Sequence, residues 1–280
     1  MNKTLIVTAD DVGLHRGMTL GAVAAHKRGI VTACSVVASG ADFTHAVELL
    51  RRTPSLAVGV HLTLVGSRPL CDPAAIPSLV DDGGRLLPAF PAFVRRYLLG
   101  SIRLGEIELE LRRQIESVKA TDLEVSHINS HQHLHALPGV FAVVCRLTEE
   151  FKLPYVRLPV DRGPRACTPA RRLALLTLGA CGQLARRAAA RACNATLGDG
   201  TIGVAAAGHL GLDVALALLP YVSGVTELVC HPGCDQRSLA AQFAWGYEWE
   251  SEVETLCDPH LREAIAETGI TLASPADLRR

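Results

Sequence analysis

The chain has 280 residues, a length that suits one large α/β barrel or two small domains. Hydrophobic residues make up 49% of the sequence and charged residues 20%, a composition that excludes intrinsic disorder. The 28 basic and 28 acidic residues balance, and aromatic residues are only 4%, so the sequence offers neither a basic field nor a stacking surface for nucleic acid.

The predicted elements alternate between apolar strands and helices. Strands are predicted over 5–9, 30–38, 56–64, 124–129, 155–158, 227–230 and 270–272. Helices are predicted over 17–28, 43–52, 107–118, 139–151 and in the Ala/Arg-rich region beyond residue 164. Such alternation predicts an α/β protein with a parallel sheet, open or closed into a barrel. We expect a single domain over 1–280, with an inserted loop region at about 66–103 that contains short helical pieces.

The nine cysteines are scattered and include no C-x-x-C pair, whereas a disulfide framework is usually even-numbered and dense. We interpret them as reduced, mostly buried thiols of a cytoplasmic protein. The apolar run after residues 1–3 is too short for a signal peptide, and no stretch approaches the roughly 20 apolar residues of a membrane span.

Aspartate and histidine residues gather where the predicted strands end. Asp10 and Asp11 end the first strand, His61 lies late in the third, and His231 follows strand 227–230. The carboxyl ends of parallel strands open on one face, where active sites form. A divalent cation is the simplest compensation for two adjacent carboxylates, although an aspartate here would also cap the following helix.

Residues 126–135 (SHINSHQHLH) contain four of the eleven histidines. Histidine is the commonest neutral metal ligand and a natural proton-transfer group. His131 and His133 would share one side of an extended strand, so that one ligates while the other supports it, and the sequence leaves open which is the ligand. His127 and His135 are weaker candidates.

His61 interrupts an apolar strand, where a lone histidine is more often a satisfied core residue. With Asp11 and His131 as partners it completes a set of one carboxylate and two imidazoles. Such a set leaves coordination positions open to water, as in catalytic zinc sites, and it also holds iron.

Other chemistries have weaker support. No G-x-S-x-G, H-E-x-x-H, Walker A or strand-following G-x-G-x-x-G motif is present. Cys230, beside His231, is better interpreted as a buried thiol than as a nucleophile. The stretch 165–197 has no acidic residue and is either a basic amphipathic surface for anionic headgroups or, as we favour, a barrel helix with a solvated arginine face. Its arginines are Arg165, Arg171, Arg172, Arg186, Arg187 and Arg191.

Five segments together resemble the YdjC-like carbohydrate deacetylases, in the family's order and over nearly the whole chain. They are 7–14 (VTADDVGL), 59–64 (GVHLTL), 127–135 (HINSHQHLH), 156–159 (VRLP) and 228–233 (LVCHPG). The family includes chitooligosaccharide deacetylases and hopanoid-biosynthesis-associated deacetylases. The resemblance implies a TIM-barrel-like fold related to the polysaccharide deacetylases. It also implies a divalent metal, magnesium in this family and zinc in the related enzymes.

By position, the resemblance also implies a set of site residues. The metal ligands would be Asp11, His61 and His131. Asp10 would be the general base, His231 the general acid, and Arg157 the arginine that orients the base.

Two departures from the family pattern narrow the predicted branch of the family and its substrate. Asp11 is followed by Val12 where phenylalanine is usual, and Asn129 replaces the aspartate of the common Asp-Ser-His. The hopanoid-associated branch shares this asparagine and has an inserted loop that resembles 76–85 (IPSLVDDGGR). We therefore favour that branch, in which the substrate would be an N-acetylglucosaminyl lipid.

We predict a metal-dependent hydrolase that removes the N-acetyl group from an N-acetylglucosamine-type glycan or glycolipid and releases acetate. The alternatives are a metal-dependent phosphoesterase or other amidohydrolase, and a non-catalytic sugar-binding or metal-storage protein. The presence of both Asp10 and Asp11 favours catalysis, because metal retention needs only one of them. The expected partner is the N-acetylated amino sugar and not nucleic acid, while peripheral membrane contact and a homodimer stay open.

Overall fold

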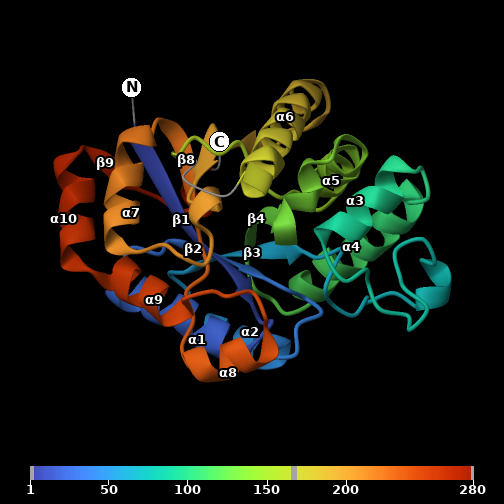
Figure 1. Ribbon diagram of the computed structural model, residues 1–280, viewed down its shortest axis with the longest axis horizontal. Helices are drawn as coiled ribbons and strands as arrows, with labels where there is room; N and C mark the ends of the chain where they lie inside the picture. The colour runs from blue at the N-terminus through green and yellow to red at the C-terminus, as the bar shows by residue number, and fades with distance from the viewer. Residues whose placement is uncertain (1–2, 165–168, 279–280) are drawn as a thin grey trace.

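A parallel β-sheet forms the centre of the molecule in the computed structural model, which describes residues 3–164 and 169–278, with the backbone alone for 169–171 and 189–192 (Figure 1). The strand order is β6-β5-β4-β3-β2-β1-β8-β7, and β9 also pairs with β1. The strands are β1 (Lys3–Val12), β2 (Ala33–Val36), β3 (Ala57–Leu62), β4 (Val125–Ser130), β5 (Tyr155–Val156), β6 (Thr196–Leu197), β7 (Gly200–Ile202), β8 (Gly224–Cys230) and β9 (Ile270–Leu272).

The sheet curls until its two ends meet at a single bridge. Beyond β5, Asp161 forms an isolated parallel bridge with Thr201 of β7. The N–H of Thr201 donates to the carbonyl of Val160 (2.9 Å), and the N–H of Arg162 donates to the carbonyl of Thr201 (2.8 Å). The predicted α/β, TIM-barrel-like fold is therefore confirmed, with its closure limited to this one rung.

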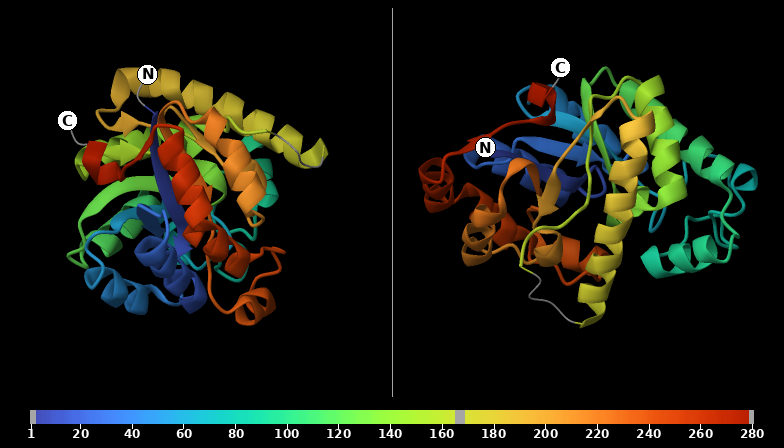
Figure 2. Two further views of the ribbon diagram at one scale, coloured as in Figure 1. Left: turned by 90° about the vertical axis from the view of Figure 1, so that its left-hand side faces the viewer. Right: turned by 90° about the horizontal axis from the view of Figure 1, so that it is seen from above.

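Helices cover the outside of the sheet (Figures 1 and 2). In Figure 1, α7, α9 and α10 flank one end of the sheet, while α3, α4 and α5 flank the other, with α6 packed beside α5. The helices are α1 (Arg16–Arg28), α2 (Phe43–Arg51), α3 (Phe90–Leu98), α4 (Leu104–Lys119), α5 (Pro138–Glu150), α6 (Pro169–Ala192), α7 (Leu212–Leu218), α8 (Gln236–Gln242), α9 (Trp249–Cys257) and α10 (Pro259–Glu267). Within the described ranges, no helix combines the length and the apolar character needed to cross a membrane.

Burial on both faces explains why β1 forms where it does. From Leu5 to Val12 every residue of this strand is buried, because helices cover one face and the barrel interior covers the other. A parallel strand in this position has a nearly continuous apolar sequence. The exceptions, Thr8, Asp10 and Asp11, therefore need polar partners inside the protein.

The structure contains each predicted strand and adds β6 and β7, which the sequence did not indicate. These two strands have two and three residues, too few to show a period-two pattern. Helices α7 to α10 were also not predicted. The predicted strand 30–38 is shorter than expected, because only 33–36 pair as β2.

Buried polar residues of α4 hold the segment between β3 and α4, which contains a short 3-10 helix (Pro73–Ala75) and α3. Glu110 accepts hydrogen bonds from the N–H groups of Leu70 (3.0 Å) and Cys71 (2.9 Å). Glu106 accepts one from the N–H of Ser78 (2.7 Å). These buried carboxylates supply acceptors to partly buried N–H groups of the segment and so fix its path against α4.

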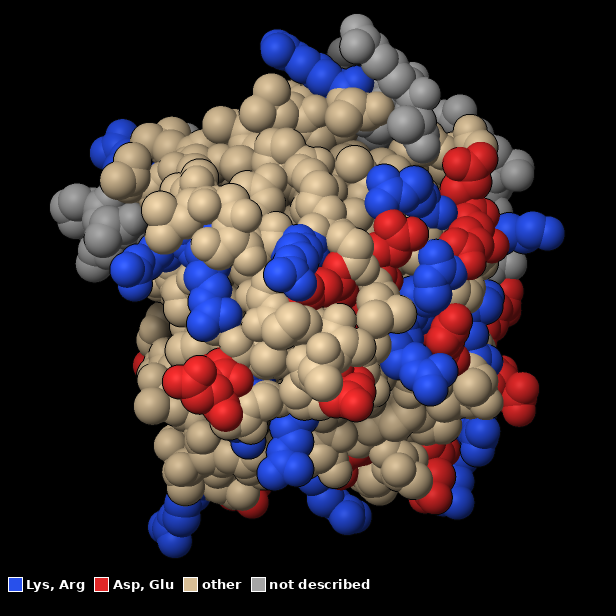
Figure 3. Space-filling model, turned by 90° about the vertical axis from the view of Figure 1, so that its right-hand side faces the viewer, with Lys and Arg blue, Asp and Glu red and all other residues tan. Residues whose placement is uncertain are grey.

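Charges of both signs are interleaved on the face that carries α4 and α5 (Figure 3). Glu108 of α4 pairs with Arg146 of α5 (2.6 Å), and Arg112 of α4 pairs with Glu150 of α5. This face therefore has no patch of a single sign that would attract a polyanion.

Candidate metal centre and active site

The carboxyl ends of four strands bring the candidate residues together. Asp10 and Asp11 lie near the end of β1, His61 near the end of β3, and His131 directly after β4. Within the sheet, His61 lies opposite Asn129 of β4. His231 follows β8. The aspartates and histidines that the sequence places at strand ends thus lie together in one cluster, as expected.

A bulge near the end of β1 aims both aspartates at the same pocket. The register of β1 with β2 shifts between Ala9 and Val12, and Asp11 has a left-handed backbone with φ 64°. This conformation breaks the alternation that would point adjacent side chains to opposite faces. The alternative that these aspartates cap the next helix is wrong, because His15 caps α1 by accepting the N–H of Gly17 (2.9 Å).

Asp11, His61 and His131 form a candidate three-ligand metal site. Asp11 Oδ1 lies 3.3 Å from Nε2 of His61 and 2.9 Å from Nδ1 of His131. One donor atom from each residue lies within 4.8 Å of the other two. Burial opposes ionisation of Asp11, but His131 and His61 hold the pKa of this carboxyl well below its usual range.

The hydrogen bonds of His61 fit a cation at this position. Its Nδ1 lies 2.7 Å from Oδ1 of Asn129 and 2.9 Å from Oγ of Ser35. Because the Ser35 hydroxyl donates to Asp10 (2.8 Å), we infer that Nδ1–H of His61 is the donor to both oxygens. Nε2 then presents its lone pair to the Asp11 carboxylate, an arrangement that a bound cation stabilises.

Asp10 is clamped by a buried arginine. Nη1 of Arg157 donates to Oδ2 of Asp10 (2.5 Å), and Nη2 donates to Oδ1 (2.9 Å). The amide of Asn129 donates to the same Oδ1 (3.0 Å). Burial raises the pKa of Asp10, but the charges of Arg157 and His61 outweigh it and hold this pKa well below the usual range. Asp10 is therefore an ionised, tightly oriented carboxylate.

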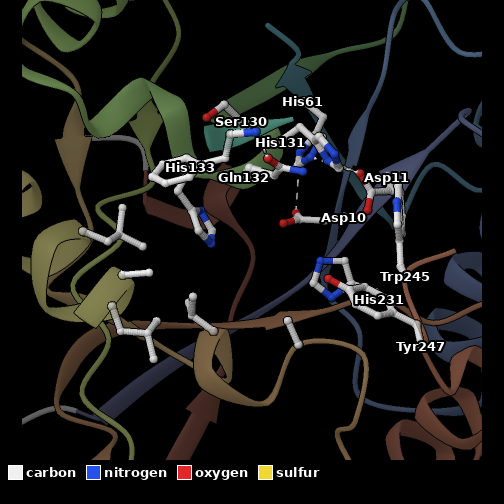
Figure 4. A pocket seen from close by; sticks show the side chains of 16 residues that line it. Asp10, Asp11, His61, Ser130, His131, Gln132, His133, His231, Trp245 and Tyr247 are labelled. Atoms are coloured by element: carbon white, nitrogen blue, oxygen red, sulfur yellow. Dashed lines mark hydrogen bonds and ion pairs between the residues drawn. The ribbon is translucent and has the colours of Figure 1, made fainter. Parts of the chain in front are cut away.

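His231 faces Asp10 from another wall of the pocket. Figure 4 shows Asp10 between His61 and His231, with Asp11 and Trp245 on one side and His133 on the other. The main-chain N–H of His231 donates to Oε2 of the buried Glu252 (2.6 Å).

The pocket of about 440 Å³ joins this polar cluster to an apolar wall. Its polar end contains both aspartates, His61, His131 and His231. The apolar wall comes from α6 and from the segment after β7, through Ala174, Leu175, Leu178, Val204 and Ala207. Trp245 and Tyr247 form a third side, with the Trp245 ring 5.5 Å from that of His131 and the Tyr247 ring 5.2 Å from that of His231.

The structure places His131, rather than His133, in the cluster with Asp11 and His61. The expectation that both lie on one extended strand is wrong, because β4 ends at Ser130 and a short 3-10 segment begins at His131. Gln132 and His133 have positive φ of 53° and 55°, which turns His133 away from Asp11. His135 is fully buried, with Nε2 2.9 Å from the carbonyl oxygen of Arg157.

The structure also describes Cys230 and part of the arginine-rich stretch 165–197. Cys230 is fully buried and its thiol donates to the carbonyl of Thr8 (3.3 Å), while burial raises its pKa, so it is not an activated nucleophile. Arg165 and the side chains of Arg171 and Arg191 lie outside the described residues. Arg186 donates to the carbonyl of Gly198 (2.9 Å) and is thus partly engaged.

Several site residues were missed from the sequence. Asn129 and Ser35 orient His61 and Asp10, and Glu252 holds the backbone of His231. Asn129 lies within the histidine-rich segment 126–135, and its polarity inside a buried strand is a signal that the sequence carries. Glu252 lies in α9, and nothing in its local pattern distinguishes it from a surface acid.

The fold and this site define an α/β-barrel protein with a candidate metal centre and neighbouring acid–base groups at the carboxyl ends of its strands. The chain belongs to the YdjC-like protein family, whose model matches residues 4–267. The family predicted from the five segments is therefore confirmed.

Relatives that match over nearly their full length share about a third of their residues with this chain. A carbohydrate deacetylase of Geobacillus stearothermophilus is 32% identical over 274 residues, which cover 97% of this chain and 96% of that protein. A chitooligosaccharide deacetylase of Serratia marcescens is 31% identical over 288 residues, covering 99% and 100%. A carbohydrate deacetylase of Brevibacillus brevis is 39% identical over 155 residues, covering 55% of this chain and 59% of that protein.

Solved structures share the same fold. A protein of Enterococcus faecalis V583, described as a candidate cellobiose-phosphate cleavage protein, superposes with a TM-score of 0.80 at 28% identity and full coverage of both chains. A mutant of a CE4 family pseudoenzyme with restored enzymatic activity gives a TM-score of 0.51 at 11% identity, covering 99% of this chain and 67% of that one. The second likeness concerns the fold alone.

Proposed function

We propose that this protein removes the N-acetyl group from an N-acetylglucosamine-type glycan or glycolipid and releases acetate. The observation that carries the proposal is the convergence of Asp11, His61 and His131 beside an Asp10 carboxylate that Arg157 clamps. The predicted class, a carbohydrate deacetylase, is confirmed at the level of the family, because full-length relatives carry that name.

The donor set supports a divalent ion at Asp11, His61 and His131. Two imidazoles and one carboxylate with open positions are typical of catalytic zinc, whereas magnesium prefers oxygen ligands. We propose Zn²⁺ on this ground, with Mg²⁺ as the ion that the family resemblance implies. When bound, the ion supplies Lewis-acid polarisation of the acetamide carbonyl and lowers the pKa of water. Metal analysis of the purified protein distinguishes the two ions.

Acid–base catalysis is assigned to the groups that flank the candidate metal site. Asp10 accepts the proton of the attacking water, a role that its ionised state and fixed orientation support. Arg157 and Asn129 keep its oxygens aimed while the proton moves. His231, held through its backbone by Glu252, donates a proton to the departing amine.

Acetate release tests this function directly. The purified protein is incubated with chitooligosaccharides and with a sugar phosphate, and free acetate and free phosphate are measured. We expect acetate and no phosphate, since no observation in the structure favours phosphate transfer. Phosphate release without acetate would replace the proposal by a phosphoesterase.

The apolar wall of the pocket supports a lipid-linked substrate. Leu175 and Leu178 of α6 line the pocket, and Leu173 and Leu176 of the same helix are 67% and 50% exposed. A helix that lines a pocket with some leucines and presents others to solvent supports contact of the pocket rim with an apolar membrane surface. We therefore include an N-acetylglucosaminyl lipid as substrate and peripheral membrane contact through α6.

Substitution of an exposed leucine tests the proposed membrane contact separately from the deacetylation reaction. Leu173→Ser should reduce sedimentation with vesicles of acidic phospholipid, while acetate release from soluble chitooligosaccharide stays unchanged. Leu99→Ser, at an equally exposed leucine beyond α3, is the matched control. Equal vesicle binding by the original chain and the Leu173 variant would remove the membrane contact from the proposal.

A further inference from the structure

Glu227 is a fully buried carboxylate of β8 that neither joins the candidate metal ligands nor lines the pocket. Its Oε1 accepts hydrogen bonds from Nη2 of Arg157 (2.8 Å) and from the hydroxyl of Thr8 (2.6 Å). Its Oε2 accepts one from the hydroxyl of Tyr155 (3.1 Å). Side chains of β1 and β5 therefore hold this carboxylate in place from two directions.

Glu227 and Asp10 share a single nitrogen of Arg157. Nη2 donates one bond to Oδ1 of Asp10 (2.9 Å) and one to Oε1 of Glu227 (2.8 Å), which uses both of its hydrogens. Nη1 donates to Oδ2 of Asp10 (2.5 Å). A guanidinium group is rigid and planar, so an acceptor that fixes Nη2 also fixes the direction in which Nη1 approaches Asp10.

The third nitrogen of the guanidinium, Nε, does not fix its orientation. Among the described residues, Nε of Arg157 has no hydrogen-bond partner although it is buried. Within the same part of the chain, the acceptors of Nη1 and Nη2 are the two carboxylates of Asp10 and Glu227. Loss of Glu227 would leave a hydrogen of Nη2 unsatisfied, and the group would tilt to relieve that cost at the expense of its contacts with Asp10.

We propose that Glu227 is a positioning residue that acts through Arg157 to hold the two oxygens of Asp10 in their catalytic orientation. The proposal rests on the role given to Asp10 in the proposed function. A purely stabilising role fits less well, because well-packed apolar residues usually stabilise an interior at least as well as a buried ionic cluster such as that of Asp10, Arg157 and Glu227. Positioning accounts for why three charges are kept there.

Two substitutions at Glu227 distinguish the effect of its hydrogen-bond acceptors from the effect of the space that its side chain fills. Glu227→Met keeps a side chain of similar size without an acceptor, and we expect kcat for acetate release to fall about 10- to 100-fold with KM within about twofold. Glu227→Gln keeps an oxygen toward Arg157 and should retain kcat within about threefold. Glu110→Met removes another fully buried carboxylate, one that does not line the pocket and whose hydrogen bonds go to Leu70, Cys71 and Gln114, and it should leave kcat unchanged.

A double-mutant cycle with Arg157→Lys tests whether the effect passes through the arginine. In the Arg157→Lys background, Glu227→Met should lower kcat less than twofold further. The proposal would be overturned if Glu227→Met lowered kcat as much in the Arg157→Lys background as it does in the wild type. It would also be overturned if Glu227→Met had the kcat of the wild type. If Glu227→Met does not fold, the near-isosteric Thr8→Val removes one bond to Glu227 and should lower kcat about threefold; unchanged kcat would again overturn it.

Crystal structures of the wild type and of Glu227→Met give a readout that needs no turnover. We expect Arg157 to lose one of its two contacts with Asp10 in the variant. An Arg157 that keeps both contacts would refute positioning. If the contact is lost but the wild type releases no acetate from any amino sugar, the proposed function fails and the positioning role stands.

Discussion

Buried carboxylates occur in two regions of this molecule, and the two regions differ in what the oxygens bind. On α4, Glu110 accepts from the N–H groups of Leu70 and Cys71 and from the amide of Gln114 (2.8 Å). At the strand ends, Asp11 faces two imidazole nitrogens within 3.3 Å and borders an open pocket. Burial alone therefore does not mark a reactive carboxylate. The distinguishing property is whether its partners are ordinary donors or groups that themselves bind a cation.

Removal of the metal should produce the largest loss of activity. If activity survived metal removal, the contrast between the strand-end carboxylates and those of α4 would not hold. We expect a chelator to reduce acetate release to background and a divalent ion to restore it. His131→Ala should lose the ion, because it removes one of three ligands, whereas His133→Ala should keep it. Metal content by mass spectrometry checks both variants. If His131→Ala kept both its metal and its activity, the strand-end residues would have a structural role, as the buried carboxylates of α4 do.

Asp10→Asn should have the next largest effect. The amide keeps the shape of the side chain but does not accept the proton of water, so kcat should fall about 10²- to 10⁴-fold. The metal content should not change, because Asp10 is not among the three candidate ligands. Steady-state kinetics with metal analysis test this, and an active Asp10→Asn would transfer the base role to another group.

Acid should destabilise the barrel interior through its buried histidines. Burial lowers the pKa of both His127 and His135 from 6.5 to about 4. Between these values the unfolded chain binds more protons than the folded chain, so the free energy of unfolding decreases as the pH falls, by up to about 3 kcal/mol for each histidine. Denaturant unfolding from pH 7 to pH 4, with chelator present, measures this slope.

Substitution of one histidine provides the control for the acid effect. His135→Gln should make the pH slope shallower, whereas the exposed His260→Gln should leave it unchanged. An identical slope in all three proteins would assign the acid sensitivity to other groups.

Glu110→Met should show the smallest effect on activity and sharpen the contrast between the two regions. Loss of the carboxylate leaves the partly buried N–H groups of Leu70 and Cys71 without their acceptor, so the free energy of unfolding should fall by about 1 to 3 kcal/mol. Because these donors lie away from the pocket, kcat/KM should stay within twofold of the wild type. Denaturant unfolding and steady-state kinetics measure the two quantities, and a large loss of kcat/KM would contradict the structural role.

Strands β1 to β5, β8 and β9 were predictable because strands buried on both faces give continuous apolar runs, whereas β6, β7 and α7 to α10 were not predicted. The convergence of Asp11, His61 and His131 followed from the rule that parallel strands end on one face. The position of His133 was not predictable, because it depends on the left-handed turn at Gln132. The roles of Glu227 and Glu252 depend on hydrogen-bond donors more than 20 residues away in sequence, and no local pattern reports such contacts.

The left-handed backbone of Asp11 has a consequence for how this protein responds to selection. At φ 64° an aspartate is tolerated but strained, whereas glycine adopts this geometry without penalty. A glycine at position 11 would keep the bulge while removing the anionic partner of His61 and His131. The backbone at this position therefore favours glycine, and the retention of aspartate there reflects what its carboxylate binds.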